Sequence, residues 1–261
     1  MPPMISIVTA TINTPKWAEL LIKSIRKFTT IEHEIIVIDN ASSAINLIWL
    51  REQKDIRLVE NKENNFHGGA MDQGTELALG RYVCFMDADS HFQRHGWDKD
   101  MLEIYHSDSL IRLIAKGGPI DMGKPLHPPM FFYEKEFILK NKLSFRYMPG
   151  IPKSTDTAQK VYWDILDLGY KVKIISRFVH IYDQKVGGDE IWINGKPTMY
   201  HHHCGSRLQE LRSSDDPLPP RKPNRGAWGG WIGDEEERKK YLERTALLFE
   251  QPLVKEIMEG K

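Results

Sequence analysis

The chain has 261 residues, of which 41% are hydrophobic and 28% charged, as is usual for a globular protein with a sizeable core. Lysine plus arginine and aspartate plus glutamate each total 36, so the formal net charge is zero. This balance argues against a protein whose main ligand is nucleic acid, because such proteins normally carry a basic excess.

The first half of the chain alternates segments typical of strands and of helices. We expect strands at 5–10, 34–39, 56–59 and 82–86, separated by helices at about 17–28, 45–50 and 69–78. The run 34–39 is apolar up to Asp39, as a parallel strand buried on both faces requires. The alternation predicts βαβ units, a mostly parallel central sheet flanked by helices, and therefore an α/β fold.

The second half is less regular. We expect a strand at 110–116, a Pro- and Gly-rich loop at 123–129, a short strand or helix at 131–140, an amphipathic helix at 158–168 and a strand at 172–176. Prolines mark 213–223 as a linker, which leads to Trp228 and Trp231, a predicted flap over the ligand, and to a charged helix at about 235–250. The chain thus divides into a donor-binding half (1–116), an acceptor-binding and catalytic half of the same domain (117–212), and a C-terminal extension (213–261).

The sequence carries no sign of export or membrane insertion. No apolar run approaches the roughly 20 residues that span a bilayer, and the N-terminus lacks the basic and apolar regions of a signal peptide. The cysteines, Cys84 and Cys204, lie far apart, which fits a reducing compartment. We expect a cytoplasmic protein, with peripheral attachment to the inner face of a membrane as the other option.

Polar residues follow several of the predicted strands. In open parallel sheets, ligands bind outside the carboxyl ends of the strands. The first strand ends in the segment that holds Thr9, Thr11 and Asn13, the second in Asp39, and the fourth in Asp87-Ala88-Asp89. This edge of the sheet is the predicted site.

Asp87 and Asp89 are the sharpest signal. Residues two apart on an extended segment point the same way, so both carboxylates can face one Mn²⁺ or Mg²⁺ ion. Such an ion neutralises the charge that develops on a departing diphosphate. The alternative is a polar turn after a strand, and the position at the end of a fourth βαβ strand favours the metal site over it.

Two further signals have a structural alternative. Asp39 can accept the imide N–H of a uracil ring, or it can form an Asx turn with Ser42 and Ser43. Gly68 and Gly69 let the backbone approach an anion at a helix start, or they simply form a strand-to-helix turn.

Four segments in order, 7–13, 36–42, 64–74 and 78–90, resemble the opening of glycosyltransferase family 2. The resemblance implies a GT-A fold, a UDP- or other nucleotide-linked sugar donor, a divalent metal and inversion at the anomeric carbon. It also implies that Thr11 and Asp39 contact the nucleoside, that Asp72 lies near the base or ribose, and that Asp87 and Asp89 handle ribose, metal and diphosphate. The remaining residues of these motifs that we assign to donor binding are Thr9, Asn13, Asn65, Gly68, Gly69 and Ala88.

An inverting transfer needs a general base for the acceptor hydroxyl. The family places an acidic residue shortly before a helix that ends in a Gly-aromatic pair, and Asp156 matches that position here, ahead of Gly169-Tyr170. Its alternative role is to stabilise the helix start, by about 0.5–2 kcal/mol. Asp164, deeper in the same helix, is the other candidate base.

The cluster at 200–207 completes the predicted site. His201 and His203 share one face of an extended segment and resemble the late histidine that GT-A enzymes add to their metal. Arg207 suits a diphosphate through its planar guanidinium. A zinc site that includes Cys204, or a polar surface strand, are the alternatives.

The sequence therefore predicts an inverting glycosyltransferase that moves a sugar from a UDP-sugar to a hydroxyl of a glycan or similar acceptor. One alternative is a sugar-1-phosphate nucleotidyltransferase, which normally carries a glycine-rich basic loop after its first strand; segment 11–16 contains no glycine. The other is a non-catalytic module that binds nucleotide sugar or carbohydrate.

Overall fold

The computed structural model describes residues 4–118, 124–175, 178–180, 188–202, 239, 243 and 245–260. The predicted linker at 213–223 and the predicted flap at Trp228 and Trp231 lie outside these residues.

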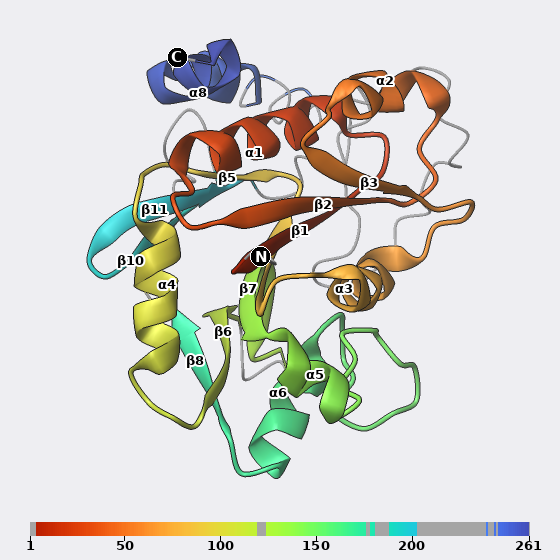
Figure 1. Ribbon diagram of the computed structural model, residues 1–261, viewed down its shortest axis with the longest axis vertical. Coiled ribbons are helices and arrows are strands. Elements are labelled where there is room, and N and C mark those ends of the chain that lie inside the picture. The colour runs from red at the N-terminus through yellow and green to blue at the C-terminus, as the bar shows by residue number, and fades with distance from the viewer. Residues whose placement is uncertain are drawn as a thin grey trace.

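A seven-stranded sheet with the order β3-β2-β1-β4-β7-β6-β8 runs through the centre (Figure 1). Four of its neighbouring pairs are parallel, and β7 runs antiparallel to β4 and to β6. The predicted mostly parallel sheet is confirmed. The strands are β1 (Ile5–Thr11), β2 (His33–Asp39), β3 (Ile56–Glu60), β4 (Tyr82–Asp87), β6 (Ile111–Gly117), β7 (Leu126–Glu134) and β8 (Lys171–Ile175).

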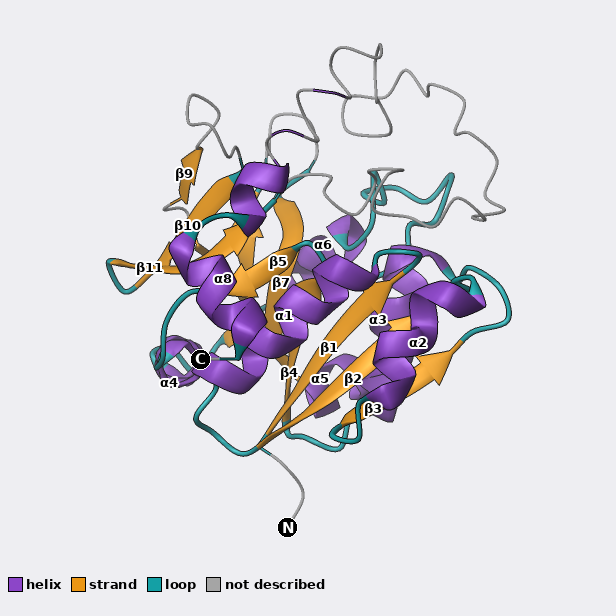
Figure 2. Cartoon of the chain, turned by 90° about the horizontal axis from the view of Figure 1, so that it is seen from above, coloured by secondary structure: helices purple, strands orange, loops and turns teal. Residues whose placement is uncertain are grey.

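Helices cover both faces of this sheet (Figure 2). One buried cluster joins Ile5 and Ile7 of β1 to side chains of α1 (Pro15–Phe28), α2 (Ala44–Glu52) and α4 (Trp97–His106). The other joins Val8 of the same strand to side chains of α3 (Phe66–Leu77), α5 (Lys135–Lys140) and α6 (Gln159–Asp167). Because successive strand residues point to opposite faces, one apolar strand supplies both cores. The last helix, α8 (Pro252–Glu259), packs on α1.

A second, four-stranded sheet lies beside the first and was not predicted. Its order is β5-β11-β10-β9, all antiparallel, with β5 (Ser90–Phe92), β9 (Phe178–His180), β10 (Asp189–Ile193) and β11 (Lys196–His201). The strands are short, and the pairing of β5 with β11 joins segments that are far apart in the chain. No local periodicity encodes such a pairing.

The loop predicted at 123–129 is wrong at its second half, because β7 begins at Leu126 and pairs with β6 there. The helix predicted at about 235–250 is confirmed where it can be followed, since residues 245–249 are helical. The separate helix α8, which follows it, was not predicted.

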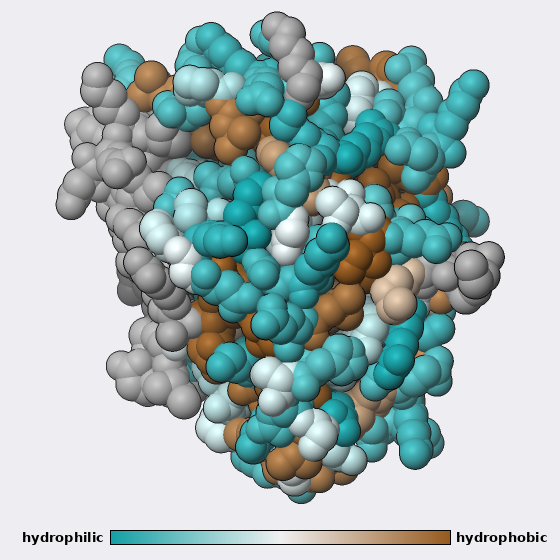
Figure 3. Space-filling view, turned by 60° about the vertical axis from the view of Figure 1, so that its left-hand side comes forward, coloured by the Kyte–Doolittle hydropathy of each residue, from teal (hydrophilic) through white to brown (hydrophobic). Residues whose placement is uncertain are grey.

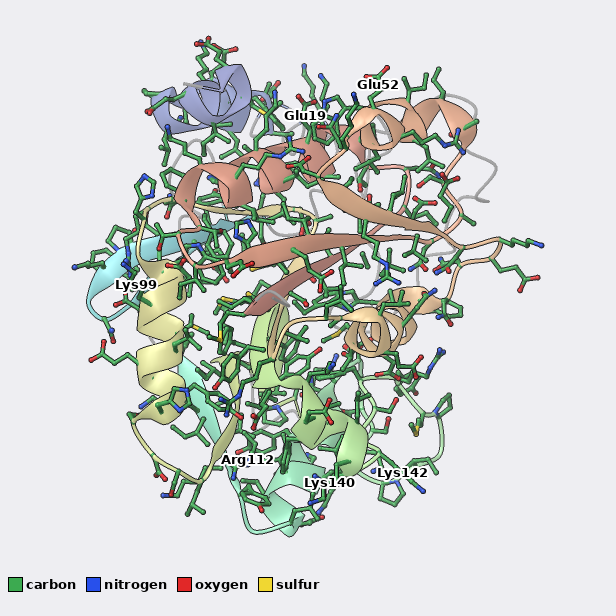
Figure 4. The ribbon with its side chains drawn as sticks, viewed as in Figure 1. Glu19, Glu52, Lys99, Arg112, Lys140 and Lys142 are labelled. Carbon is green, nitrogen blue, oxygen red and sulfur yellow. The ribbon has the colours of Figure 1, made fainter. Side chains whose placement is uncertain are left out.

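Many charged side chains lie on the outside of the molecule. Glu19, Glu52 and Lys99 project from α1, α2 and α4, and Arg112 and Lys140 lie toward the opposite end (Figure 4). Hydrophilic side chains cover most of the face in Figure 3, with apolar atoms between them. Among the described helices, none is both long enough and apolar enough to cross a membrane.

Candidate functional site

Strand register brings the predicted site residues to one edge of the large sheet. Thr11 at the end of β1 is paired with Asp39 at the end of β2, and Ala10 is paired with Asp87 at the end of β4. Because these strands are parallel, their carboxyl ends open onto the same side. The strand ends that were predicted to form one edge of the sheet therefore do lie side by side.

Asp87, Asp89 and His201 form a compact group at this edge. One ligand atom from each can be chosen so that all lie within 4.8 Å of one another. The Nε2 atom of His201 lies 3.5 Å from Oδ1 of Asp89 and 3.7 Å from Oδ2 of Asp87. The two carboxylates are ligands that Mn²⁺ and Mg²⁺ prefer, and the imidazole nitrogen is a donor that suits transition-metal ions.

The second sheet is what brings His201 to the two aspartates. Asp87 ends β4, and the turn through Ala88 and Asp89 leads directly into β5. In the antiparallel pair of β5 and β11, His201 lies opposite Ser90, and the N–H of His202 donates to the carbonyl oxygen of Asp89 (2.9 Å). The histidine is thus fixed by backbone pairing.

His67, at the start of α3, also reaches this group, with Nε2 2.8 Å from Oδ1 of Asp87. Burial acts to lower the pKa of His67, but the charge of Asp87 and a hydrogen bond to it outweigh burial and raise the pKa. Burial likewise opposes the raised pKa of His201, which Asp89 and Asp87 cause. The charges of Asp87 and Asp89 thus favour positive charge on both imidazoles.

Asp39 is buried and held by its own turn. Its Oδ2 accepts the N–H of Ser42 (2.9 Å), and its Oδ1 accepts the hydroxyl of the same serine. Burial raises the pKa of Asp39, and the hydrogen bonds from Ser42 partly offset this. The Asx turn given as the alternative role is thus present, and each carboxylate oxygen retains capacity for a further donor.

Thr9, Thr11 and Asn13 are all buried, and Thr11 and Asn13 lie beside this turn. The hydroxyl of Thr11 bonds that of Thr14 (2.7 Å). Asn13, in the left-handed region with φ 52°, donates its N–H to Ser42 Oγ (2.8 Å) and accepts the N–H of Ser43 (2.8 Å). These contacts fasten the loop after β1 to the loop after β2.

The glycines at the start of α3 allow close packing within the protein. A Cβ atom on Gly68 would lie 2.4 Å from the carbonyl oxygen of Phe145, and one on Gly69 would lie 2.7 Å from Oδ1 of Asn65. That same Oδ1 accepts a hydrogen bond from Arg146 (3.0 Å). The segment at 145–146 therefore lies so close to the helix start that Gly68 leaves no room for a side chain. The sequence did not indicate this reason for glycine.

Asp72 binds the neighbouring loop. Its Oδ1 accepts the N–H of Phe145 (2.8 Å), its Oδ2 accepts the hydroxyl of Ser144 (2.6 Å), and Arg146 Nε lies 3.5 Å away. Burial raises the pKa of Asp72, against these hydrogen bonds. In this structure the carboxylate anchors the loop at 144–146, and its predicted contact with the base or ribose stays a prediction.

Asp156 precedes α6, as predicted, and its side chain is 49% exposed. Its Oδ2 accepts a hydrogen bond from Lys124 (2.9 Å), and Oδ1 accepts the N–H of Thr157. The charge of Asp156 also makes a small contribution to the raised pKa of His67. Asp164 instead forms an ion pair with Lys160 of the same helix, α6, with Nζ and Oδ2 2.6 Å apart.

The other predicted residues at 203–207, His203, Cys204 and Arg207, lie outside the described residues. Sequence reasoning missed His67 as a neighbour of Asp87. It also missed His127 and Asp189, which are neighbours of His201, and Lys116, which pairs with Asp189. The only signal for His67 was a histidine at a predicted helix start beside the strand-end carboxylates.

The sequence matches known glycosyltransferases over its first part. The family model described as "Glycosyl transferase family 2" matches residues 6–152, more than half of the chain. An uncharacterized glycosyltransferase of Methanocaldococcus jannaschii is 34% identical over 93 residues, 33% of this chain and 32% of that protein. TuaG of Bacillus subtilis, assigned to teichuronic acid biosynthesis, is 30% identical over 105 residues, 39% of this chain and 40% of TuaG. The matches thus span two fifths or less of these relatives.

Two solved glycosyltransferases share the fold. A mannosyltransferase from Pyrobaculum calidifontis, in complex with GDP-Man and Mn²⁺, has a TM-score of 0.52 at 17% identity over 67% of this chain and 55% of that chain. S. aureus TarS 1–349 has a TM-score of 0.52 at 16% identity over 79% of this chain and 62% of that chain. At these identities the likeness shows the fold alone, which is GT-A.

Proposed function

The chain belongs to glycosyltransferase family 2, and on that premise we propose that it is a metal-dependent inverting glycosyltransferase. It transfers a sugar from a nucleotide-sugar donor, with UDP as the nucleotide, to a hydroxyl of a glycan or similar acceptor. The observation that carries the proposal is the group formed by Asp87, Asp89 and His201 beside the Asp39 turn, at the carboxyl edge of the sheet.

Each part of the site has a role in this reaction. Asp87, Asp89 and His201 would hold Mn²⁺ or Mg²⁺, and the bound ion would neutralise charge on the diphosphate leaving group. The buried carboxylate of Asp39 accepts the imide N–H of the base, a hydrogen bond that selects uracil. The loops after β1 and β2, fastened through Asn13, form the wall of the nucleoside pocket.

Asp156 is the proposed general base. As the acceptor oxygen forms its bond to the anomeric carbon, the bond from that carbon to the diphosphate breaks, and the hydroxyl proton passes to the Asp156 carboxylate. Attack from the side opposite the leaving group inverts the anomeric configuration. Lys124, which binds Asp156 Oδ2, is positioned to orient this carboxylate.

Calorimetric titration with UDP, GDP, CMP and ADP, each with and without Mn²⁺, tests the donor and the metal together. We expect tight binding of UDP that is lost without the ion, and loss of that metal-dependent binding in Asp89→Ala. A preference for GDP would keep the metal site and overturn the role of Asp39. Absence of metal-dependent binding to every nucleotide would contradict the proposed function and favour a non-catalytic module.

A further inference from the structure

A buried ion pair lies next to His201, one of the three residues (Asp87, Asp89 and His201) of the proposed metal site. Lys116, at the end of β6, has a 4% exposed side chain, and Asp189, at the start of β10, is fully buried, with Nζ and Oδ2 2.6 Å apart. Taking both charges out of water costs so much that apolar residues of similar volume often stabilise a fold equally well. General stability is therefore a weak explanation for this pair.

The pair belongs to a set of four residues that join the two sheets. Lys116 lies opposite His127 in the pairing of β6 with β7, and Asp189 lies opposite His201 in the pairing of β10 with β11. The rings of His127 and His201 are 5.5 Å apart between centroids, and Lys116 Nζ lies 3.5 Å from His127 Nδ1. One of these four residues is thus His201, the histidine that faces Asp87 and Asp89.

The backbone of β6 is irregular at this point. The register of β6 with β7 shifts between Ala115 and Lys116, so that Ala115 lies opposite Phe131 while Lys116 lies opposite His127. Irregularities of this kind redirect a side chain and are common beside active sites. Here the shift lies at the residue whose side chain reaches from the large sheet to Asp189 of the second sheet.

We propose that Lys116 and Asp189 are positioning residues of the metal site. Their ion pair holds β10 and β11 against the end of β6 and thereby sets the place and ring orientation of His201 relative to Asp87 and Asp89. The inference rests on the proposed function, since it takes this group as the metal site. Outer partners of this kind typically change metal affinity by about 10–100-fold.

The test is titration of the full chain with Mn²⁺ alone, followed by electron paramagnetic resonance of free and bound Mn²⁺. In the double variant Lys116→Met/Asp189→Leu, no charge is left buried without its partner, so the chain is expected to fold. We expect Mn²⁺ to bind about 10–100-fold more weakly. We also expect the nitrogen coupling of bound Mn²⁺, which reports ligation by histidine, to be reduced.

Arg94→Met is the matched control, because Arg94 braces the other end of the same hairpin. It pairs with Asp100 and donates to Thr198 Oγ1 (2.9 Å) and to the carbonyl oxygen of Ile193 (3.3 Å). Loosening this end should lower stability and leave Mn²⁺ affinity and nitrogen coupling unchanged. Equal losses of Mn²⁺ affinity in both variants would mean that general loosening, and not positioning of His201, is responsible.

The outcomes separate the two proposals. If the wild-type chain binds no Mn²⁺, the proposed metal site fails and the positioning role fails with it. If the wild type binds Mn²⁺ and the double variant binds it equally well with the same nitrogen coupling, only the positioning role is wrong. A double variant that does not fold also contradicts that role, because the pair would then be required for the fold itself.

Discussion

Asp156 and Asp164 show how neighbours separate two carboxylates of similar sequence context. Asp156 is half exposed and is bound by Lys124 from another segment, and its charge contributes to the raised pKa of His67. Asp164 is held by Lys160 of its own helix, four residues away. Of the two, Asp156 therefore stays the proposed base.

Asp156→Asn should leave metal-dependent nucleotide affinity unchanged and lower the rate of sugar transfer by about 10²–10⁴-fold, because the amide cannot take the acceptor proton. Calorimetry with UDP and Mn²⁺ measures the first, and a transfer assay the second. Asp164→Asn, which breaks the pair with Lys160, is the control and should transfer at the wild-type rate. Full turnover by Asp156→Asn would remove this residue as the base.

The sequence predicted which residues lie at the ends of the strands. It did not predict which distant residues those side chains contact. Asp39 and Asp87 were placed at strand ends by local apolar runs alone. That Asp72 anchors the loop at 144–146, and that Gly68 meets Phe145, depend on a contact between α3 and a distant segment. Sequence spacing carries no information on such a contact.

At the scale of elements, α4 is fastened to the loop between α1 and β2 by one buried carboxylate. Oδ2 of Asp98 accepts the N–H groups of Thr30 (2.6 Å) and Ile31 (2.7 Å) and the hydroxyl of Thr30 (3.0 Å), and Oδ1 accepts the N–H of Lys99 (3.0 Å). Burial acts to raise the pKa of Asp98, but these hydrogen bonds outweigh burial and lower it.

Asp98→Asn should therefore lower the free energy of unfolding at pH 7 by about 1–3 kcal/mol, since an amide oxygen is a weaker acceptor and its NH₂ group meets donors. Because the folded pKa lies below the unfolded value, the stabilisation is complete above the unfolded pKa of about 3.9 and is lost as pH falls through the folded pKa. Urea unfolding at pH 7 and pH 3 measures the difference between variant and wild type.

Asp108→Asn is the control for this prediction, because Asp108 also has a lowered pKa, caused chiefly by its hydrogen bond from Lys171, but is partly exposed to solvent. It should change stability little at either pH. A gap between Asp98→Asn and wild type that stays the same at pH 3 would show that the charge of Asp98 is not what stabilises this junction.

For the whole molecule, α8 closes the outer side of α1. Val254 and Ile257 are buried there, Lys23 donates to the carbonyl oxygen of Met258 (2.6 Å), and Lys27 pairs with Glu256 (2.9 Å). The end of the chain thus covers an apolar surface that belongs to the first helix. This packing makes the C-terminal residues part of the main core.

Ending the chain at Gln251 should lower the free energy of unfolding by about 3–6 kcal/mol, because each of the two buried side chains contributes about 1.5–3 kcal/mol. Urea unfolding followed by circular dichroism measures the loss. Lys27→Met, which removes the partly exposed ion pair to Glu256 and leaves α8 in place, should cost less than about 1 kcal/mol. An unchanged unfolding midpoint after truncation would mean that α8 is not part of the cooperative unit.

The sequence by itself determined the α/β class, the parallel strands of the first half and the acidic residues that end them. Those features follow from local periodicity, because a strand buried on both faces must be apolar and its polar neighbours must lie at its ends. His201 was expected beside Asp87 and Asp89 only through the family resemblance. Only the tertiary structure decided that His67 meets Asp87, that a second sheet exists, and that Lys116 pairs with Asp189 next to His201. These contacts join segments far apart in the chain, and they form because long-range strand pairing and burial stabilise the whole fold, which no short window of sequence records.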